Sequence, residues 1–367
     1  MEAVQRVVLS KWLTMGAEVQ AFEKEFGAMQ EAQHALAVAN ASAGLHLAFL
    51  ALPLGPGDEI IQPALNFVAA ANMTMAVGAT PVFADIIDLT EPTIDPRHVE
   101  KLVSPRTRAI VVMHYGGNLC RMAELTQICR DHGLVLIEDA CHAVGARYHD
   151  SAQRTPHGVM AGSIGDIGVF SFFANKNIAV GEGGMVITNR DDLAERVRLL
   201  RSHGMSSLTW DRHKGHASSY DVVANGYNYR LDELHAAIGR VQLAKLQRNN
   251  KRRQYLLSQY RDCLQSLAGW MMPFADSIDH SSGHLMVVLA PTNKIRNKAV
   301  SALREARIQS SMHYPCIPDF NIFRVQQADG IKNTRQFTER AITLPLFPTM
   351  THDQVQDTVN CLRSVVV

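Results

Sequence analysis

The sequence predicts an α/β protein with a mostly parallel sheet covered by helices, followed by a smaller α+β region. Between residue 30 and about residue 190, short apolar runs alternate with helix-like stretches, which is typical of a parallel sheet. Two of these runs, residues 108–113 and 134–137, are dense in valine, isoleucine and leucine, as strands buried on both faces are. A long helical pattern at 231–260 then precedes a shorter strand and helix alternation.

Each expected element follows from the spacing of apolar residues and from residues that end helices or strands. The expected strands share short apolar or β-branched runs, at residues 35–39, 59–61, 80–84, 108–113, 134–137, 167–173, 185–188 and 283–290. The expected helices share helical spacing of apolar residues, at 41–52, 67–77, 122–132, 231–260, 294–306 and 353–365. The third of these ends at Gly133, a common stop signal. The basic segment 248–253 is expected to be a solvated helix face that connects two domains.

Composition excludes several classes of protein. With 367 residues and 47% hydrophobic content, the chain can bury a large core. Its 36 basic and 35 acidic residues give no preference for nucleic acid or a membrane surface. No apolar run approaches the roughly 20 residues of a membrane span, and the first residues lack a signal-peptide pattern. The six cysteines are scattered without a C-x-x-C pair, and the histidines lack partners at ligand spacing. We therefore expect reduced thiols, a cytoplasmic location and no metal site.

Lys176 is the first candidate for chemistry. It follows the apolar run 167–173 and precedes the glycine-rich segment 181–184. This placement puts an amine at the mouth of a sheet, where partial burial disfavours the ammonium form and frees the amine to attack a carbonyl. The alternative is an ordinary lysine at the edge of the core.

Asp139 comes directly after the strand 134–137, where open parallel sheets bind ligands. A carboxylate there could pair with a protonated ring nitrogen. The alternative is a helix N-cap, since residues 140–144 could begin a helix. His142 lies three residues further on and could reach the same ligand.

The segment 40–44, Asn-Ala-Ser-Ala-Gly, lies between an expected strand and an expected helix. Small residues and a hydroxyl at a helix N-terminus suit a phosphate group, because free N–H groups and the helix dipole converge there. Plain capping by Asn40 or Ser42 is the alternative. No Walker lysine follows, so the segment is not a nucleotide P-loop.

With Asp139, Ser171 and Lys176 taken together, the chain resembles the DegT/DnrJ/EryC1/StrS family. Its members are fold-type I aminotransferases that depend on pyridoxal 5'-phosphate (PLP) and mostly act on nucleotide-linked keto sugars. The matching segments span nearly the whole chain and are 16–23, 40–45, 63–69, 78–83, 137–140, 170–184, 226–233, 242–243, 313–315 and 344–346. The resemblance implies a large PLP-binding domain, residues 1–245, with a mostly parallel seven-stranded sheet and an N-terminal arm or helix at 1–30. Residues 246–367 would form the small C-terminal α+β domain with its connecting helix.

The resemblance also implies roles for individual residues. Lys176 would form the internal aldimine and then move a proton between substrate and cofactor. Asp139 would pair with the pyridinium nitrogen, and His142 would lie near the phenolic oxygen. Phe67 would stack on the pyridine ring. The phosphate group would be bound by the residues of two turns, namely Ala41, Ser42, Ala43 and Ser171.

Further positions extend the site beyond one chain. Asn228 would reach the phosphate from the partner subunit, with Arg230 beside it, so the resemblance implies a homodimer with shared active sites. His313 and Tyr314 are candidate substrate contacts near the mouth of the site. Weaker candidates for a sugar-linked diphosphate lie in a polar loop, at Arg212, Lys214 and His216, where ordinary surface residues are the alternative. Two departures from the family pattern are Ala41-Ser42 for Gly-Thr and Asn66 for threonine.

The function implied by the resemblance is transfer of an amino group from glutamate or glutamine to the keto group of a nucleotide-linked sugar, in amino-sugar biosynthesis. Transfer to a cyclitol, or a PLP-dependent dehydration or epimerisation of a similar sugar, are alternatives. A related dehydratase branch has histidine at the lysine position, and Lys176 argues against that branch. A non-catalytic, ligand-sensing regulator is the alternative from another class.

Overall fold

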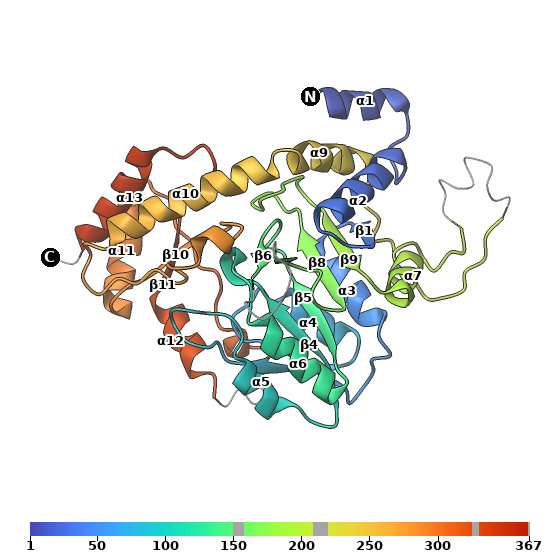
Figure 1. The fold of residues 1–367 in the computed structure, drawn as a ribbon, viewed down its shortest axis with the longest axis horizontal. Coiled ribbons are helices and arrows are strands. Elements are labelled where there is room, and N and C mark those ends of the chain that lie inside the picture. The colour runs from blue at the N-terminus through green and yellow to red at the C-terminus, as the bar shows by residue number, and fades with distance from the viewer. Residues whose placement is uncertain (150–157, 208–218, 325–329, 366–367) are drawn as a thin grey trace.

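The computed structural model describes residues 1–149, 158–207, 219–324 and 330–365, and it is organised around one seven-stranded sheet (Figure 1). The sheet order is β1-β9-β8-β5-β4-β2-β3. Its strands are β1 (His34–Val38), β2 (Glu59–Pro63), β3 (Thr80–Ala84), β4 (Thr107–Met113), β5 (Val135–Asp139), β8 (Ile167–Ser171) and β9 (Gly184–Thr188). Strands β3, β2, β4, β5 and β8 pair in parallel, and β9 runs antiparallel to both of its neighbours. The predicted mostly parallel α/β sheet is confirmed.

Helices cover both faces of this sheet, and β4 shows how the sequence requires it. Ala109 and Val111 pack into the cluster formed with α3 (Ala41–Leu50), α4 (Ala69–Ala76) and α7 (Asp191–Leu200). Ile110 and Val112 face the opposite way, toward α5 (Pro96–Leu102) and α6 (Met122–His132). Farther along the same face, α2 (Ala17–Met29) and α9 (Glu233–Leu243) cover β8 and β9. Successive strand residues point to opposite faces, so a run without polar residues is buried on both.

The C-terminal part forms a separate cluster of buried side chains beside the sheet, reached along α10 (Figure 1). Its centre is the antiparallel pair of β10 (Met286–Leu289) and β11 (Ala341–Leu344). The helices of this part are α10 (Leu246–Leu264), α11 (Asn293–Glu305), α12 (Lys332–Arg340) and α13 (His352–Arg363). The remaining elements are α1 (Glu2–Ser10), β6 (Arg147–Tyr148), β7 (Val159–Met160) and the short 3-10 helices η1 (Tyr115–Gly117), η2 (Ile278–His280) and η3 (Ile317–Asp319). The domain boundary after residue 245 stays a prediction.

The single helix expected over 231–260 is wrong, because α9 ends at Leu243 and α10 begins at Leu246. At the break, the N–H of Lys245 donates to the carbonyl of Gln242, three residues back, at 3.0 Å. This shorter hydrogen bond tightens the chain into a turn before the α-helical pattern resumes. No glycine or proline marks the position, so the sequence carried no breaker signal there.

The solvated basic face expected at 248–253 is also wrong for Arg253, whose residue exposure is 8%. Its Nη1 donates to the carbonyl oxygen of Leu346 at 2.8 Å and to that of Gly283 at 3.5 Å. Burial lowers the pKa of its guanidinium to about 10. Arg253 therefore ties α10 to two segments of the C-terminal part instead of facing water.

Glu233 connects the start of α9 to the start of α2. Its buried carboxylate accepts hydrogen bonds from the N–H groups of Gly16 at 2.8 Å, Glu18 at 2.9 Å and Val19 at 2.9 Å. These are N–H groups that a helix cannot satisfy within itself. A carboxylate at this end also faces the positive pole of the helix. One side chain from residue 233 therefore caps a helix that begins more than 200 residues earlier.

Replacing Glu233 with alanine should lower the free energy of unfolding by about 3 kcal/mol, because three N–H groups, two of them buried, lose a charged acceptor. Urea titration followed by circular dichroism measures the change. Glu195→Ala, on the exposed side of α7, is the control and should change the free energy by less than about 0.5 kcal/mol. Equal stability of the two variants would contradict this role.

Two further observations bear on the expectations from sequence. The weak diphosphate candidates Arg212, Lys214 and His216 lie outside the described residues. Within the described ranges, none of the helices combines the length and apolar character needed to cross a membrane.

Candidate active site

A cavity of about 550 Å³ lies at the carboxyl ends of β5 and β8, next to the N-terminus of α3. It brings together nine of the residues expected from sequence, namely Ala41, Ser42, Phe67, Asp139, His142, Ser171, Lys176, His313 and Tyr314. Ala43, Asn228 and Arg230 are not among its lining residues. The cavity therefore lies outside the carboxyl ends of parallel strands, where open α/β sheets bind their ligands.

Lys176 lies in the loop that joins β8 to β9. The two strands pair as an antiparallel hairpin, with Ser171 opposite Gly184. Beyond this pair the loop is closed by two hydrogen bonds, from the Phe172 N–H to the Gly183 carbonyl at 2.8 Å and from the Val180 N–H to the Phe172 carbonyl at 2.9 Å. Both ends of the loop are thus fixed to the sheet, and the lysine is held over its edge.

The Lys176 side chain is partly buried, and Cys141 and Asp139 lie close to its amine. Burial lowers its pKa, while Cys141 and Asp139 act in the opposite direction. A lowered pKa raises the fraction of neutral amine, the form that attacks a carbonyl. This environment agrees with what the position of Lys176 in the sequence predicts.

The end of β5 carries two carboxylates that face opposite ways. Glu138 is fully buried and accepts hydrogen bonds from the N–H groups of Gly162, Ile164 and Gly165 at 2.5–2.8 Å. The imidazole Nε2 of His114 lies 2.8 Å from the same carboxylate. Asp139, the next residue, lines the cavity instead.

Asp139 does not cap a helix, so that alternative is wrong. Residues 140–145 form turns, and the carboxylate accepts a hydrogen bond from the Cys141 N–H at 3.2 Å within one of them. The Asn66 amide donates to the other oxygen at 3.4 Å. Asp139 is 4% exposed and forms no ion pair with any residue that the structure describes. A buried anion without a cation partner fits a protonated ring nitrogen.

The N-terminus of α3 is capped and still has free donors. The Asn40 side chain accepts from the Ala43 N–H at 2.8 Å, so capping by Asn40 occurs, and Ala43 has no free N–H for a phosphate group. The N–H groups of Ala41 and Ser42 have no hydrogen-bond partner in the described part of the chain. Gly184 passes so close that an added Cβ would lie 2.8–2.9 Å from atoms of Asn40 and Ala41. Glycine is therefore required where β9 meets this turn.

One wall of the cavity is aromatic. Phe67 is half exposed, and its ring centroid lies 5.7 Å from that of Tyr314. His142 stacks on Tyr314, with its Nε2 2.8 Å from the tyrosine hydroxyl. Burial, reinforced by Lys176 and His313, holds the pKa of His142 well below its ordinary value, so the imidazole is neutral. An aromatic group bound between these rings would lie on an apolar, uncharged surface.

His313 marks the border between this cavity and a second one. Its Nδ1 lies 3.0 Å from the Thr343 hydroxyl, and its carbonyl oxygen accepts from the Tyr115 hydroxyl. Burial and the nearby Lys176 lower the pKa of His313 to about 4. The second cavity, of about 930 Å³, shares His313 and Asn175 with the first.

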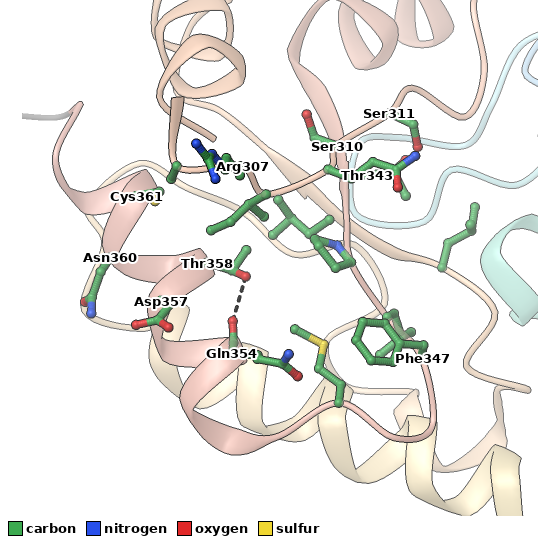
Figure 2. A pocket seen from close by; sticks show the side chains of 18 of the residues that line it. Arg307, Ser310, Ser311, Thr343, Phe347, Gln354, Asp357, Thr358, Asn360 and Cys361 are labelled. Carbon is green, nitrogen blue, oxygen red and sulfur yellow. Dashed lines mark hydrogen bonds between the residues drawn. The ribbon is translucent and has the colours of Figure 1, made fainter. Parts of the chain in front are cut away.

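The second cavity is lined by both polar and apolar side chains, nearly all of them from the C-terminal part. Figure 2 shows Gln354 and Thr358 on α13 on the side opposite Ser310 and Arg307, which lie between α11 and β11. The Thr358 hydroxyl donates to the carbonyl of Gln354 at 2.7 Å. This space adjoins the candidate active site at Asn175 and His313.

Asn228 and Arg230 lie away from the cavity of their own chain. Asn228 pairs with Ser202 in an isolated antiparallel bridge, and Arg230 pairs in the same way with Val38. The Nη1 of Arg230 is buried without a partner among the described residues, and burial, together with Arg201, lowers the pKa of its guanidinium.

Several lining residues were not expected from sequence. Asn175, Glu182, Met113 and Cys141 line the cavity, and His284 approaches the amine of Lys176. Three of them stand next to or near expected residues, so the turns around Asp139 and Lys176 could have indicated them. His284 comes from another part of the chain, and no local pattern marks it.

The cavity fits PLP on structural grounds. A buried carboxylate lacks a cation partner, two helix N-terminal amides lack acceptors, and an amine with a lowered pKa lies in the same space. These groups match a protonated ring nitrogen, a phosphate group and an aldehyde carbon. The fold and this site define an enzyme of the fold-type I transferase class.

Comparison with known proteins identifies the family. The model of the DegT/DnrJ/EryC1/StrS aminotransferase family matches residues 1–363. The chain is 39% identical over 374 aligned residues to the spore coat polysaccharide biosynthesis protein SpsC of Bacillus subtilis, covering 100% of this chain and 94% of that protein. This chain therefore belongs to the DegT/DnrJ/EryC1/StrS family, and it is an aminotransferase.

Solved structures agree with this assignment. Helicobacter pylori PseC, an aminotransferase involved in the biosynthesis of pseudoaminic acid, superposes with a TM-score of 0.90 at 28% identity, over 99% of this chain and 95% of PseC. DesI, solved in the presence of its TDP-sugar product, superposes with a TM-score of 0.87 at 30% identity, over 99% of this chain and 88% of DesI.

Stability should fall in mild acid because the site keeps histidines neutral. In the unfolded chain His313 titrates near 6.5, and in the folded chain near 4, so between these values the unfolded state binds more protons. The contribution of neutral His313 to the free energy of unfolding is therefore complete above pH 6.5, and it is lost as the pH falls toward 4. His313 alone accounts for up to about 2 kcal/mol at pH 5.

Urea titrations at pH 7.5 and pH 5.0 test this, with His313→Gln compared with the natural chain. The variant should lose less stability between the two pH values, because it lacks one of the groups that titrate. Equal losses would contradict the neutral, shielded state of His313.

Proposed function

We propose that this enzyme transfers an amino group from glutamate or glutamine to the keto group of a nucleotide-linked sugar, with PLP attached to Lys176. The observation that carries the proposal is the meeting of Lys176, Asp139 and the α3 N-terminus in one cavity. Each answers a different requirement of the same cofactor, since one attaches it, one keeps its ring protonated and one binds its phosphate group.

Bound PLP would supply an electron sink for the carbon that gains or loses the amino group. The protein supplies the rest. Asp139 keeps a proton on the ring nitrogen by charge pairing. Ala41, Ser42 and Ser171 would hold the phosphate group, and Phe67 would lie against the ring. Lys176 would carry the proton at its Nζ, because its lowered pKa raises the fraction of neutral amine that can accept a proton.

A sugar substrate is supported by the relatives and by the space available. SpsC and PseC act in the biosynthesis of a polysaccharide and of pseudoaminic acid, and DesI makes a TDP-sugar. Here, the second cavity meets the first at Asn175 and His313. A sugar held beside Lys176 would have room for a nucleotide in that adjoining space. His313 and Tyr314 would then contact the sugar at the junction.

We further propose a homodimer in which Asn228 and Arg230 complete the partner's site. Both lie outside the cavity of their own chain, which agrees with a role in the site of a partner subunit. The cytoplasm is the proposed location, in keeping with six free cysteine thiols.

Lys176→Ala should abolish the half-reaction with glutamate. The natural protein loaded with PLP should be yellow, lose its absorption band with glutamate, and release 2-oxoglutarate in equal amount. Borohydride should add the mass of the cofactor to the peptide that contains Lys176. Lys298→Ala, an exposed lysine on α11, should behave as the natural protein.

A protein that cannot be loaded, or a Lys176→Ala variant that still converts glutamate, would refute the assignment. The acceptor is tested next, by adding keto sugars with and without a nucleotide to the amino-loaded enzyme. Return of the original spectrum with a nucleotide-linked keto sugar, and not with the free sugar, is expected. The opposite preference would refute the nucleotide-linked substrate.

Mixing an inactive variant with a weakly active one tests the shared site. Asn228→Ala should weaken PLP binding and reduce activity at least roughly tenfold, since it removes a hydrogen bond to a charged group. When Lys176→Ala and Asn228→Ala chains are unfolded together and refolded, half of the dimers pair unlike chains, and one of their two sites is intact. Activity should return to about a quarter of the natural value. No recovery would place Asn228 in the site of its own chain.

A further inference from the structure

Lys176 has a nitrogen acceptor facing its amine. The Nε2 of His284 lies 3.5 Å from the Lys176 Nζ. His284 is 5% exposed and lies in the segment that leads into β10. The histidine therefore approaches the lysine from the C-terminal part of the chain, while the lysine is carried by the large sheet.

A chain of amide hydrogen bonds decides which ring nitrogen of His284 carries the proton. The Asn250 amide nitrogen donates to the carbonyl of Val144 at 2.9 Å, so the oxygen of Asn250 is free to accept. The Asn177 amide nitrogen donates to that oxygen and to the carbonyl of Ser282, both at 2.9 Å. The oxygen of Asn177 therefore faces the Nδ1 of His284, 3.0 Å away. Nδ1 must donate this bond, which leaves Nε2 with its lone pair toward Lys176.

The imidazole of His284 stays neutral in this environment. Burial, with His142, Lys176, Arg253 and His313 as further causes, holds its pKa well below the ordinary value. The neighbouring ring of His142 lies 4.3 Å away between centroids. A second proton on His284 would add a charge to a space that already contains an amine and a guanidinium.

We propose that His284 is a positioning residue for Lys176, its Nε2 lone pair accepting one N–H of the amine. An amine that donates one N–H to a fixed acceptor directs its lone pair away from that acceptor. Here, that direction would be toward the space shared with Asp139 and His142. The inference rests on the proposed function in one respect only, that Lys176 is the residue that PLP uses.

The arrangement also links the C-terminal part of the chain to the chemistry. The amide chain joins α10, through Asn250, and the segment before β10, through the Ser282 carbonyl, to the residue next to Lys176. The amine is therefore oriented correctly only when these segments are in place. Withdrawal of the segment around His284 would remove the acceptor.

The protonation of His284 can be read directly by nuclear magnetic resonance on protein labelled with ¹⁵N-histidine. The His284 signal is identified by its loss in His284→Gln. Its Nδ1 should carry the proton and its Nε2 none, with no change between pH 8 and pH 6. A proton on Nε2 would overturn the proposal.

The effect on Lys176 is measured in cofactor-free protein, by following acetylation of the Lys176 peptide against pH with mass spectrometry. The ionisable groups that share this cavity with the amine or approach it are Asp139, Cys141, His142, Glu182, His284, His313 and Tyr314. In His284→Leu, the apparent pKa of Lys176 should fall by about one unit, a tenfold change in proton affinity, because the ammonium form loses an acceptor. His284→Gln, which keeps an acceptor oxygen, should restore most of the difference.

The matched control is His98→Gln. The Nδ1 of His98 also accepts an N–H, that of Asp85 at 2.9 Å, but outside the cavity. The His98→Gln variant should leave the pKa of Lys176 unchanged. An unchanged pKa in folded His284→Leu, or a glutamine variant that behaves like leucine, would overturn the proposal. Neither measurement needs PLP, so failure of the proposed function would appear separately, as protein that cannot be loaded.

Discussion

The buried carboxylate of Glu138 is the interaction on which the site depends. It accepts three backbone N–H groups from the segment 162–165 and lies beside the imidazole of His114. That segment leads directly into β8, which carries Ser171 and then Lys176. Because neighbouring strand residues face opposite ways, anchoring Glu138 on one side of β5 turns Asp139 toward the other. A single carboxylate thus sets the relative positions of the two groups that the proposed chemistry requires.

Local sequence patterns were sufficient to predict most strands of the sheet and the central residues of the site. The helix predicted at 122–132 agrees with α6 at both ends, since apolar periodicity and Gly133 both mark it. Lys176 and Asp139 could be found because each comes after a clearly apolar run in the sequence, 167–173 and 134–137. The strand predicted at 167–173 is two residues too long, because hydrophobic Phe172 and Phe173 belong to the loop that turns toward the lysine. Apolar character does not show where pairing with β9 ends.

What the sequence could not show is decided by tertiary contacts. His284 approaches Lys176 from 108 positions away, and no spacing rule connects the two. The basic sequence around Arg253 predicts a solvated side chain, yet Arg253 is buried, where it donates to the carbonyl oxygens of Gly283 and Leu346. Ala43 lies in a turn that suits phosphate, but Asn40 uses its N–H for capping. In each case the partner is fixed by the fold, and the residue alone does not predict it.

The loop that carries Lys176 has a consequence for how this protein can change in evolution. Its ends are paired as Ser171 with Gly184, and β9 continues in register from Gly184 to Thr188. An inserted or deleted residue that shifted this register by one would turn Met185, Val186 and Ile187 to the opposite faces of the sheet. It would also move Gly184 from beside Asn40 and Ala41, where a side chain has no room. Descendants of this gene can therefore exchange side chains in the loop far more easily than they can alter its length.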